Sequence, residues 1–247
     1  MDTLFISDLH LSPERPHQLD LFKQLLRGPA RKANALYILG DIFEQFWVGT
    51  DDITPPNPDI VQELSDFTRS GARVFIQKGN RELLLDQTFG DLTGSTVLPD
   101  RAIINMDGER VLLMHGDLLC TRDWKYQAFR RFVLYPPVRT LFSCLPYSVR
   151  ILLAHGLRPA IQRSSMRKAP EIVDVDPSSV EHALRSNEVN EIIHGHTHRP
   201  GIFEITQGGI SARRIVLGDW YAEERILVCR NRERHLIPVS IYLQQNR

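Results

Sequence analysis

The sequence is poor in cysteine, has no excess charge of either sign and lacks a long uninterrupted apolar segment. Its 247 residues contain three cysteines with no paired spacing, so a disulfide framework is not expected. The 30 basic and 30 acidic side chains cancel, which disfavours a general nucleic-acid binder because neutralising phosphates requires a basic excess. The longest apolar region, 132–157, is broken by prolines and arginines, so no membrane-spanning helix is expected. We expect no signal peptide and a reducing, cytosolic compartment.

The residues that are present predict one α/β domain with a substantial core. Hydrophobic residues make up 42% of the chain. In the first hundred residues, short aliphatic runs alternate with amphipathic segments, a pattern typical of βαβ units around a central sheet. Strands are expected at 3–7, 35–39, 73–77, 111–115, 191–194, 213–217 and 225–229, and helices at 17–27, 58–69 and 82–90. The last quarter of the chain predicts antiparallel strands, in a mixed sheet or two stacked sheets.

Residues 122–170 interrupt this pattern and carry an unusual local charge. Between 122 and 168 there are ten basic side chains and one acid, Asp123, so this segment is +9 and the rest of the chain is −9. Prolines divide it into two or more expected helices rich in large apolar side chains, which can pack on the body. The charge indicates either an anionic partner, such as membrane headgroups or a phosphorylated substrate, or a solvated surface that balances an acidic body.

Five short motifs place metal-binding side chains directly after expected strands. The motifs are Ser7-Asp8-Leu9-His10, Gly40-Asp41, Gly79-Asn80-Arg81-Glu82, His115-Gly116-Asp117 and His194-Gly195-His196-Thr197-His198. Each motif alone occurs often by chance, but five in order form a specific signal. Because ligands collect outside the carboxyl ends of strands in α/β sheets, the five loops are expected to converge on one site.

The residue types in these motifs suit two divalent cations. Carboxylate, amide and imidazole donors favour manganese, iron or zinc. Two such ions about 3.5–4 Å apart can hold the attacking and leaving oxygens of a phosphoryl displacement. A carboxylate must bridge the ions to relieve their repulsion, and Asp41 is the natural candidate.

These motifs resemble the signature of the calcineurin-like metallophosphoesterases over roughly residues 3–220. The resemblance implies an α/β (α+β) fold, a β-sandwich flanked by helices, in a single domain, 1–247, with 122–170 inserted as a helical cap. It also divides the metal ligands between the two ions. The set for one ion is Asp8, His10 and His198, and that for the other is Asn80, His115 and His196, with Asp41 shared.

Longer segments resemble one branch of this family, the enzymes that hydrolyse UDP-2,3-diacylglucosamine in lipid A biosynthesis. These segments are 35–41, 79–81, 114–117, 194–200 and 214–220, and Arg81 stands where many other relatives have histidine. The resemblance implies metal-activated water attack on the α-phosphorus, which releases UMP and 2,3-diacylglucosamine 1-phosphate (lipid X). It also implies two divalent ions, with Mn²⁺ expected, and a peripheral position on the anionic cytoplasmic face of a bacterial inner membrane.

The same resemblance assigns roles to individual residues. Catalytic roles fall on Asn80, Arg81 and His196. Substrate contacts are expected from Asn80, Arg81, Asp123, Ser165, Lys168 and His196, and Asp123 and Tyr126 are expected at the entrance of a chamber for the acyl chains. Ile161 departs from the branch, which often has serine there, and this puts one headgroup contact in doubt.

Several other residues favour supporting roles. Asp117 is expected to orient His115 by accepting its hydrogen bond, and Glu82 to lie in the first turn of a helix. His194 is expected to be structural and Cys120 to be a packing residue. Two other functions stay open: a phosphoesterase of the same fold with a soluble substrate, such as a dinucleoside polyphosphate or a phosphoprotein, and a scaffold that has lost catalysis. No nucleic acid and no obligate protein partner are expected.

Overall fold

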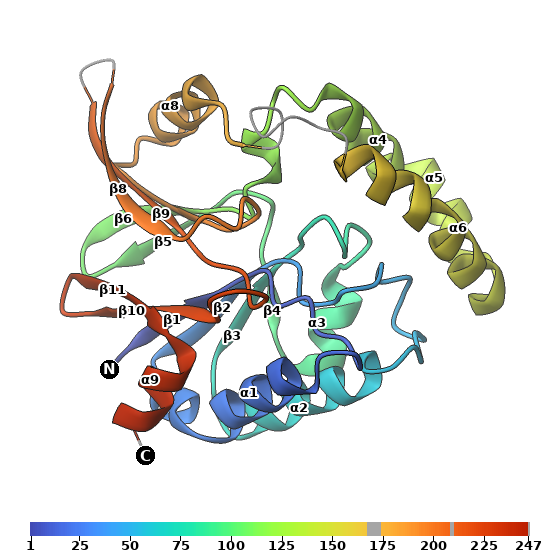
Figure 1. The fold of residues 1–247 in the computed structure, drawn as a ribbon, viewed down its shortest axis with the longest axis horizontal. Helices are drawn as coiled ribbons and strands as arrows, with labels where there is room; N and C mark the ends of the chain where they lie inside the picture. Colours follow the sequence, from blue (N-terminus) through green and yellow to red (C-terminus); the bar gives the residue numbers. More distant parts are fainter. Residues whose placement is uncertain (167–173, 208–209, 247) are drawn as a thin grey trace.

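Two β-sheets lie face to face, with helices outside them (Figure 1). The computed structural model describes residues 1–166, 174–207 and 210–246, without the side chains of 158–166, 207 and 210. One sheet has six strands in the order β11-β10-β1-β2-β3-β4, and the other has five in the order β5-β6-β7-β9-β8. This arrangement confirms the expected fold class.

The six-stranded sheet is built around three parallel strands. Its strands are β1 (Thr3–Ile6), β2 (Ala35–Leu39), β3 (Val74–Gln77), β4 (Thr96–Val97), β10 (Arg225–Arg230) and β11 (Glu233–Pro238). β2 pairs in parallel with both β1 and β3, while β10 pairs antiparallel with β1 and with β11. The carboxyl ends of β1, β2 and β3 therefore lie at one edge of the sheet.

The five-stranded sheet also has a parallel centre. Its strands are β5 (Ala102–Met106), β6 (Glu109–Leu113), β7 (Glu191–His194), β8 (Gly201–Gln207) and β9 (Ile210–Val216). β7 pairs in parallel with β6 and β9, and β5 and β8 are antiparallel edges. The prediction of antiparallel strands in the last quarter of the chain is thus right for the pairs β8–β9 and β10–β11. Strand β9, however, is parallel to its other neighbour, β7.

Alternation along the strands builds the core in layers. On β1, Leu4 and Ile6 pack against the outer helices, whereas Phe5 joins the layer between the sheets together with Leu113 and Ile215. The helices outside the six-stranded sheet are α1 (Pro16–Arg27), α2 (Asn57–Arg69), α3 (Gln87–Thr93) and α9 (Val239–Gln245), with a 3₁₀ turn, η1 (Pro29–Lys32). Helix α8 (Pro177–Asn187) covers the five-stranded sheet, and a 3₁₀ turn, η2 (Asp117–Leu119), follows strand β6.

The helix expected at 82–90 is wrong in its first half. Helix α3 begins at Gln87, because the Asp86 side chain caps it by accepting a hydrogen bond of 3.0 Å from the backbone N of Thr88. Glu82 is therefore outside any helix, and its carboxylate accepts hydrogen bonds from the backbone of the loop after β2.

Three helices project beyond the sandwich on one side (Figure 1). They are α4 (Trp124–Leu134), α5 (Pro136–Ser143) and α6 (Tyr147–Met166). The breaks between them fall at Pro136 and just before Tyr147, next to the prolines that divide the segment in the sequence. We call these three helices the cap. Among the described residues, none of the helices combines the length and apolar character needed to cross a membrane.

Candidate metal centre

The five motif loops meet where the parallel strands of both sheets end. Within the first sheet, the backbone N–H groups of Asp8 and His10 donate to the carbonyl oxygens of Gly40 and Asp41, both at 3.0 Å. In the second sheet, the N–H of Gly195 donates to the carbonyl of His115 at 2.8 Å. Backbone hydrogen bonds therefore fix the first loop to the second and the fourth loop to the fifth.

One group of ligand atoms belongs to Asp8, His10 and His198. Suitable donor atoms of these three residues all lie within 4.8 Å of one another. Nε2 of His198 is 3.3 Å from Oδ1 of Asp8, and Nε2 of His10 is 3.7 Å from Oδ2 of Asp41. Such a cluster of one imidazole pair and a carboxylate matches the donor preference of a first-row divalent cation.

A second group lies next to the first. Asp8, Asp41 and His115 also offer donor atoms within 4.8 Å of one another. The Oδ1 atom of Asn80 is 3.1 Å from Nε2 of His115 and 3.1 Å from Nδ1 of His196. Asp41 approaches both groups, since its Oδ1 is 3.8 Å from Nε2 of His115. All seven residues expected to bind metal are thus brought together.

Outer hydrogen bonds turn the imidazoles toward the cluster. Nδ1 of His115 donates to the carbonyl of Leu39 at 2.8 Å, and Nδ1 of His198 lies 2.8 Å from Oδ2 of Asp219. Each ring is left with Nε2 facing a carboxylate, the arrangement in which histidine binds metals. Asp117 was expected to orient His115, and this is wrong because the backbone of Leu39 takes that hydrogen bond.

Unpartnered buried atoms test whether this donor set fits divalent cations. Both ring nitrogens of His10 are buried and make no hydrogen bond within the described part of the chain. Buried polar atoms of this kind are costly and call for a partner. Cations between the carboxylates and imidazoles would supply one, so the residues fit two divalent ions.

Electrostatics at the cluster favour cations as well. Burial lowers the pKa of His115, but the carboxylates of Asp41 and Asp8 outweigh it and raise that pKa to about 9. At His198, burial is again outweighed, by Asp219 and Asp8, and the pKa is about 10. Burial opposes ionisation of Asp8, yet the nearby imidazoles hold the pKa of its carboxyl below the ordinary value. The carboxylates thus attract either protons or metal ions to the cluster.

The backbone at the cluster is crowded and unusual. A Cβ atom on Gly79 would collide with the Asp41 carboxylate, and one on Gly195 with that of Asp8, so both positions require glycine. Several ligand residues have the left-handed backbone that residues other than glycine rarely adopt. These residues, with their φ angles, are Asp8 (53°), His10 (46°), Asp41 (54°), His196 (68°) and His198 (54°).

A family model described as calcineurin-like phosphoesterase matches residues 1–200. The chain belongs to this family. The UDP-2,3-diacylglucosamine hydrolase of Aeromonas hydrophila is 43% identical over 96% of this chain and 98% of its own length. The protein of the same name from Pseudomonas putida strain F1 is 46% identical over 88% of this chain and 90% of its own. Among solved structures, an archaeal phosphodiesterase covers 96% of this chain and 99% of its own at 14% identity, with a TM-score of 0.48.

These comparisons confirm the family that the motifs predict and the branch that the longer segments resemble. The two hydrolases above match 96% and 88% of this chain, so the likeness to this branch extends over most of its length.

Glu82 is a functional residue that the sequence prediction missed. Its buried carboxylate accepts hydrogen bonds from the backbone N–H groups of Asp41 (3.1 Å) and Ile42 (2.5 Å). Burial and the nearby Asp41 carboxylate raise the pKa of Glu82 to about 8. Glu82 thereby fixes the loop that presents Asp41. The Gly-Asn-Arg-Glu motif includes this residue, but only the fold shows which backbone it reaches.

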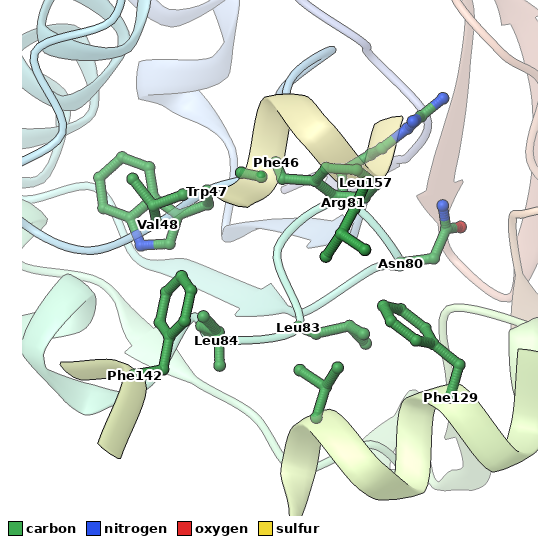
Figure 2. Close-up of a pocket in the computed structure, with 12 residues that line it drawn as sticks. Phe46, Trp47, Val48, Asn80, Arg81, Leu83, Leu84, Phe129, Phe142 and Leu157 are labelled. Carbon is green, nitrogen blue, oxygen red and sulfur yellow. The ribbon is translucent and has the colours of Figure 1, made fainter. Parts of the chain in front are cut away.

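An apolar pocket of about 90 Å³ adjoins the metal cluster. Asn80 and Arg81 lie at its polar end, while Phe129 of α4 and Phe142 of α5 line it from the cap (Figure 2). We call this cavity the chamber. It lies between the body and the cap, so its walls come from both.

Arg81 joins the chamber to the cluster. Its backbone N–H donates to Oδ1 of Asp41 at 2.9 Å, and its guanidinium carbon lies 5.7 Å from the ring centroid of Phe46. Its Nε is buried and makes no hydrogen bond to any described residue. A cationic donor at this place can bind an anionic ligand.

The other expected substrate contacts have mixed outcomes. The Asp123 side chain caps α4 by accepting a hydrogen bond of 3.2 Å from the backbone N of Tyr126. The Tyr126 ring centroid lies 6.5 Å from that of His196, so this part of α4 borders the cluster. The side chain of Ser165 is not described, nor is that of Ile161, and Lys168 lies outside the described residues.

Two minor expectations agree with the structure. His194 is fully buried, its Nδ1 lies 2.9 Å from the carbonyl oxygen of Gly195, and burial lowers its pKa to about 4. It is therefore a neutral residue of the core. Cys120 is buried among the apolar side chains beneath α8, as a packing residue should be.

Proposed function

We propose that this phosphoesterase hydrolyses the diphosphate bond of UDP-2,3-diacylglucosamine, giving UMP and 2,3-diacylglucosamine 1-phosphate. The observation that carries the proposal is the direct contact between the metal cluster and an apolar chamber, through Asn80 and Arg81. A soluble phosphate ester needs the cluster alone, whereas a diphosphate that carries two acyl chains needs both. The names of the Aeromonas and Pseudomonas relatives agree with this substrate.

The metal ligands proposed are those that surround the cluster. One ion would be held by Asp8, His10 and His198, the other by Asn80, His115 and His196, with Asp41 between them. Divalent ions there would neutralise phosphate charge and lower the pKa of a water molecule, and Mn²⁺ suits the mixed oxygen and nitrogen donors.

Arg81 and Asn80 have the proposed roles of binding and orienting the diphosphate. The Arg81 guanidinium offers a planar set of N–H donors that matches phosphate oxygens, and charge develops on these oxygens as water attacks the α-phosphorus. The Asn80 amide faces both His115 and His196 through its oxygen, so its N–H groups are available to substrate. His196 lies on the same side and completes the proposed catalytic set.

The cap has a proposed role as the holder of the acyl chains. We propose that the cap belongs to an inserted segment, residues 122–170, within a single domain of residues 1–247. Phe129, Val133 and Phe142 face the chamber from α4 and α5, opposite Leu83 and Leu84 of the body. Apolar walls on both sides exclude water from bound hydrocarbon, which is the main source of affinity for acyl chains.

The exposed apolar side chains of the cap support a second proposal, a peripheral position on an anionic membrane such as the cytoplasmic face of an inner membrane. Scattered exposed apolar residues are ordinary, but a concentration on one element indicates an interaction surface. The cap exposes Trp124, Phe132, Tyr135, Leu141, Val149, Leu152, Leu153 and Leu157. The substrate with its two acyl chains would enter from that membrane.

One experiment tests the main proposal. Purified protein is incubated with Mn²⁺ and UDP-2,3-diacylglucosamine in H₂¹⁸O, and the expected product is UMP that carries one ¹⁸O, because water attacks the α-phosphorus. Label in the lipid phosphate would contradict that direction of attack, and absence of UMP would contradict the reaction. A chelator is expected to abolish turnover.

Two matched controls sharpen this experiment. The Asp41→Ala protein should lose nearly all activity and part of its metal content, because Asp41 stands between the two groups of ligands. UDP-N-acetylglucosamine, which has the same diphosphate but no long acyl chains, should be a poor substrate. Equal turnover on both substrates would favour a soluble phosphoesterase and contradict the role of the chamber.

A further inference from the structure

The two halves of the proposed substrate must leave the metal cluster in different directions. The chamber opens beside Asn80 and Arg81 and can take only the half that carries the acyl chains. The nucleotide half therefore needs a surface elsewhere around the cluster. This inference rests on the proposed function.

Such a surface lies beside the first group of ligands. The Tyr221 ring centroid is 5.0 Å from that of His10 and 6.2 Å from that of His198. Tyr221 is 37% exposed, and its hydroxyl donates to Glu44. The loop after β9 that carries Tyr221 is fixed to the cluster, because the N–H of Trp220 donates to the carbonyl of Asp8 at 3.1 Å.

Arg15 covers the outer side of Tyr221. Its guanidinium carbon is 3.5 Å from the centroid of the Tyr221 ring. Arg15 directly precedes α1, yet its side chain makes no capping hydrogen bond. The structure records no carboxylate partner for this guanidinium among the residues that it describes. Arg15 is thus a half-exposed cation held by an aromatic ring, and its guanidinium makes no hydrogen bond to a side chain or backbone in the described part of the chain.

We propose that the Arg15–Tyr221 pair binds the pyrimidine nucleotide half of the substrate, with the base stacked on the guanidinium of Arg15. Arginine planes stack on bases as well as on aromatic side chains, and here Tyr221 already fixes the orientation of the plane. A nucleotide phosphate at the Asp8–His10–His198 group would direct its ribose and base toward this pair. The lipid half would leave through Asn80 and Arg81 on the other side.

The test measures binding of UMP and of ribose 5-phosphate to the Mn²⁺-loaded protein by calorimetry. Both ligands carry the phosphate, but only UMP carries the base, so the wild type should bind UMP more tightly. Arg15→Ala should weaken UMP binding about tenfold, the usual effect of losing one stacking partner, and leave ribose 5-phosphate unchanged. Arg15→Lys should behave like Arg15→Ala, because lysine keeps the charge but has no plane.

Controls separate this pair from other effects. Arg110→Ala removes a half-exposed arginine that pairs with Glu188 at 3.7 Å and should leave both affinities unchanged. Metal content and affinity for 2,3-diacylglucosamine 1-phosphate should stay at wild-type values in the Arg15 variants. Tyr221→Phe keeps the ring and should keep most of the preference for UMP.

The outcomes distinguish the two proposals. If the wild type releases UMP from UDP-2,3-diacylglucosamine but Arg15→Ala retains its preference for UMP, the nucleotide surface is wrong and the proposed function stands. Equal weakening of UMP and ribose 5-phosphate would make Arg15 a phosphate ligand and also overturn the stacking. If the wild type releases no UMP, the proposed function fails and this inference fails with it.

Discussion

Arg81 is the residue whose side chain connects the metal cluster with the chamber, and its substitution should separate catalysis from metal binding. Arg81→Ala is expected to lower turnover about 10²–10³-fold, the effect of removing one preorganised donor to a developing negative charge. Metal content should be unchanged, because only the backbone of Arg81 contacts Asp41. Steady-state kinetics with metal analysis checks this, with Arg81→Lys as the variant that keeps the charge. Wild-type turnover in Arg81→Ala at full metal loading would show that the role is wrong.

The histidines of the cluster predict a pH-dependent metal affinity. In the metal-free protein, His115 with a pKa of about 9 and His198 with a pKa of about 10 hold protons at neutral pH. A metal ion requires the neutral imidazole, so binding must displace these protons. The affinity for Mn²⁺ is therefore expected to rise by about tenfold per pH unit for each displaced proton between pH 6 and 8. Burial keeps the pKa of His10 and of His196 low, so these two contribute little.

Competition with a chelator of known affinity at several pH values measures this effect. The dependence should flatten only as the pH approaches about 9 to 10, where the imidazoles are already neutral. An affinity that stays constant from pH 6 to 8, after correction for the chelator, would contradict the prediction.

At the scale of single residues, the sequence predicts well which candidate ligands come together, and it predicts their supporting residues poorly. Asp8, Asn80 and His115 follow strands directly, and a strand end fixes where the next residue points. Glu82 and Asp219 each contact a loop that is distant in the chain. The Glu82 carboxylate accepts from the backbone N–H of Asp41, and the Asp219 carboxylate contacts a ring nitrogen of His198. No local spacing encodes such a contact, because it depends on how the loops fold over one another.

At the scale of elements, helix α4 is attached to the body by one buried arginine. Arg130 donates from Nε to Asp117 at 2.9 Å and forms an ion pair with Asp100 at 2.8 Å. Asp117 also accepts a hydrogen bond of 2.5 Å from Tyr126. Burial alone would raise the pKa of the Asp117 carboxyl, but the nearby positive charges of His115 and Arg130 outweigh burial and lower that pKa. This network lies two residues from His115 and fixes the cap beside the metal cluster.

The adjacent arginine offers a matched comparison. Arg130→Leu should lower the free energy of unfolding by about 3–5 kcal/mol, since it leaves the Asp117 carboxylate buried without its partner. Arg131→Leu removes the same charge from an exposed position and should change it by no more than about 0.5 kcal/mol. Urea denaturation of both variants measures the difference. Equal stability of the two proteins would show that Arg130 does not hold the cap.

The cap helices also show which element boundaries the sequence encodes. Pro136 begins α5, because proline has no N–H to donate and suits the first helical turn. The start of α3 is harder to predict, since a run from Glu82 has helical spacing but the Glu82 carboxylate is needed at Asp41. Tertiary contacts overrode local preference there.

At the scale of the whole molecule, the positive charge of the cap is partly neutralised by the acidic body. Besides Arg130, three arginines of the +9 segment pair with the body among the described residues: Arg122 with Asp176 at 3.3 Å, Arg139 with Asp86 at 3.0 Å, and Arg150 with Asp51. Ion pairs with acidic residues of the body therefore account for part of the positive charge of the +9 segment. Reversing the charge of Arg130 or Arg139 would damage the attachment of the cap, so neither is a suitable probe of membrane binding. Lys125 and Arg131 remain exposed on α4.

Apolar side chains of the cap give a cleaner test of the membrane proposal. Co-sedimentation with anionic vesicles is expected for the wild type, strongest at low salt because screening weakens the contribution of the basic residues. Leu141→Asp with Leu152→Asp should reduce it, since these side chains are 68% and 70% exposed. Ile241→Asp is the control, because Ile241 is exposed on α9, away from the cap (Figure 1). A wild type that stays in the supernatant at every salt concentration would refute membrane binding.

The overall architecture follows from the strand pattern more readily than the pairing of the strands does. Buried runs such as Ala35–Leu39 predict strands covered on both faces, and the structure has them between two layers. The division into two sheets cannot be read from the runs alone. β6 and β7 are neighbours although they are separated by the whole cap, and only long-range packing decides that.

The left-handed backbone of the proposed metal ligands has a consequence for the history of such a chain. Each of the five residues with positive φ is held at a cost of the order of 1 kcal/mol, which glycine would avoid. A duplicated gene copy freed from selection for hydrolysis would therefore gain folding stability from some of the same substitutions that destroy its cluster. Loss of catalysis is therefore an easy evolutionary step for this architecture. Its reversal is difficult, because each ligand that is restored lowers the folding stability of the protein.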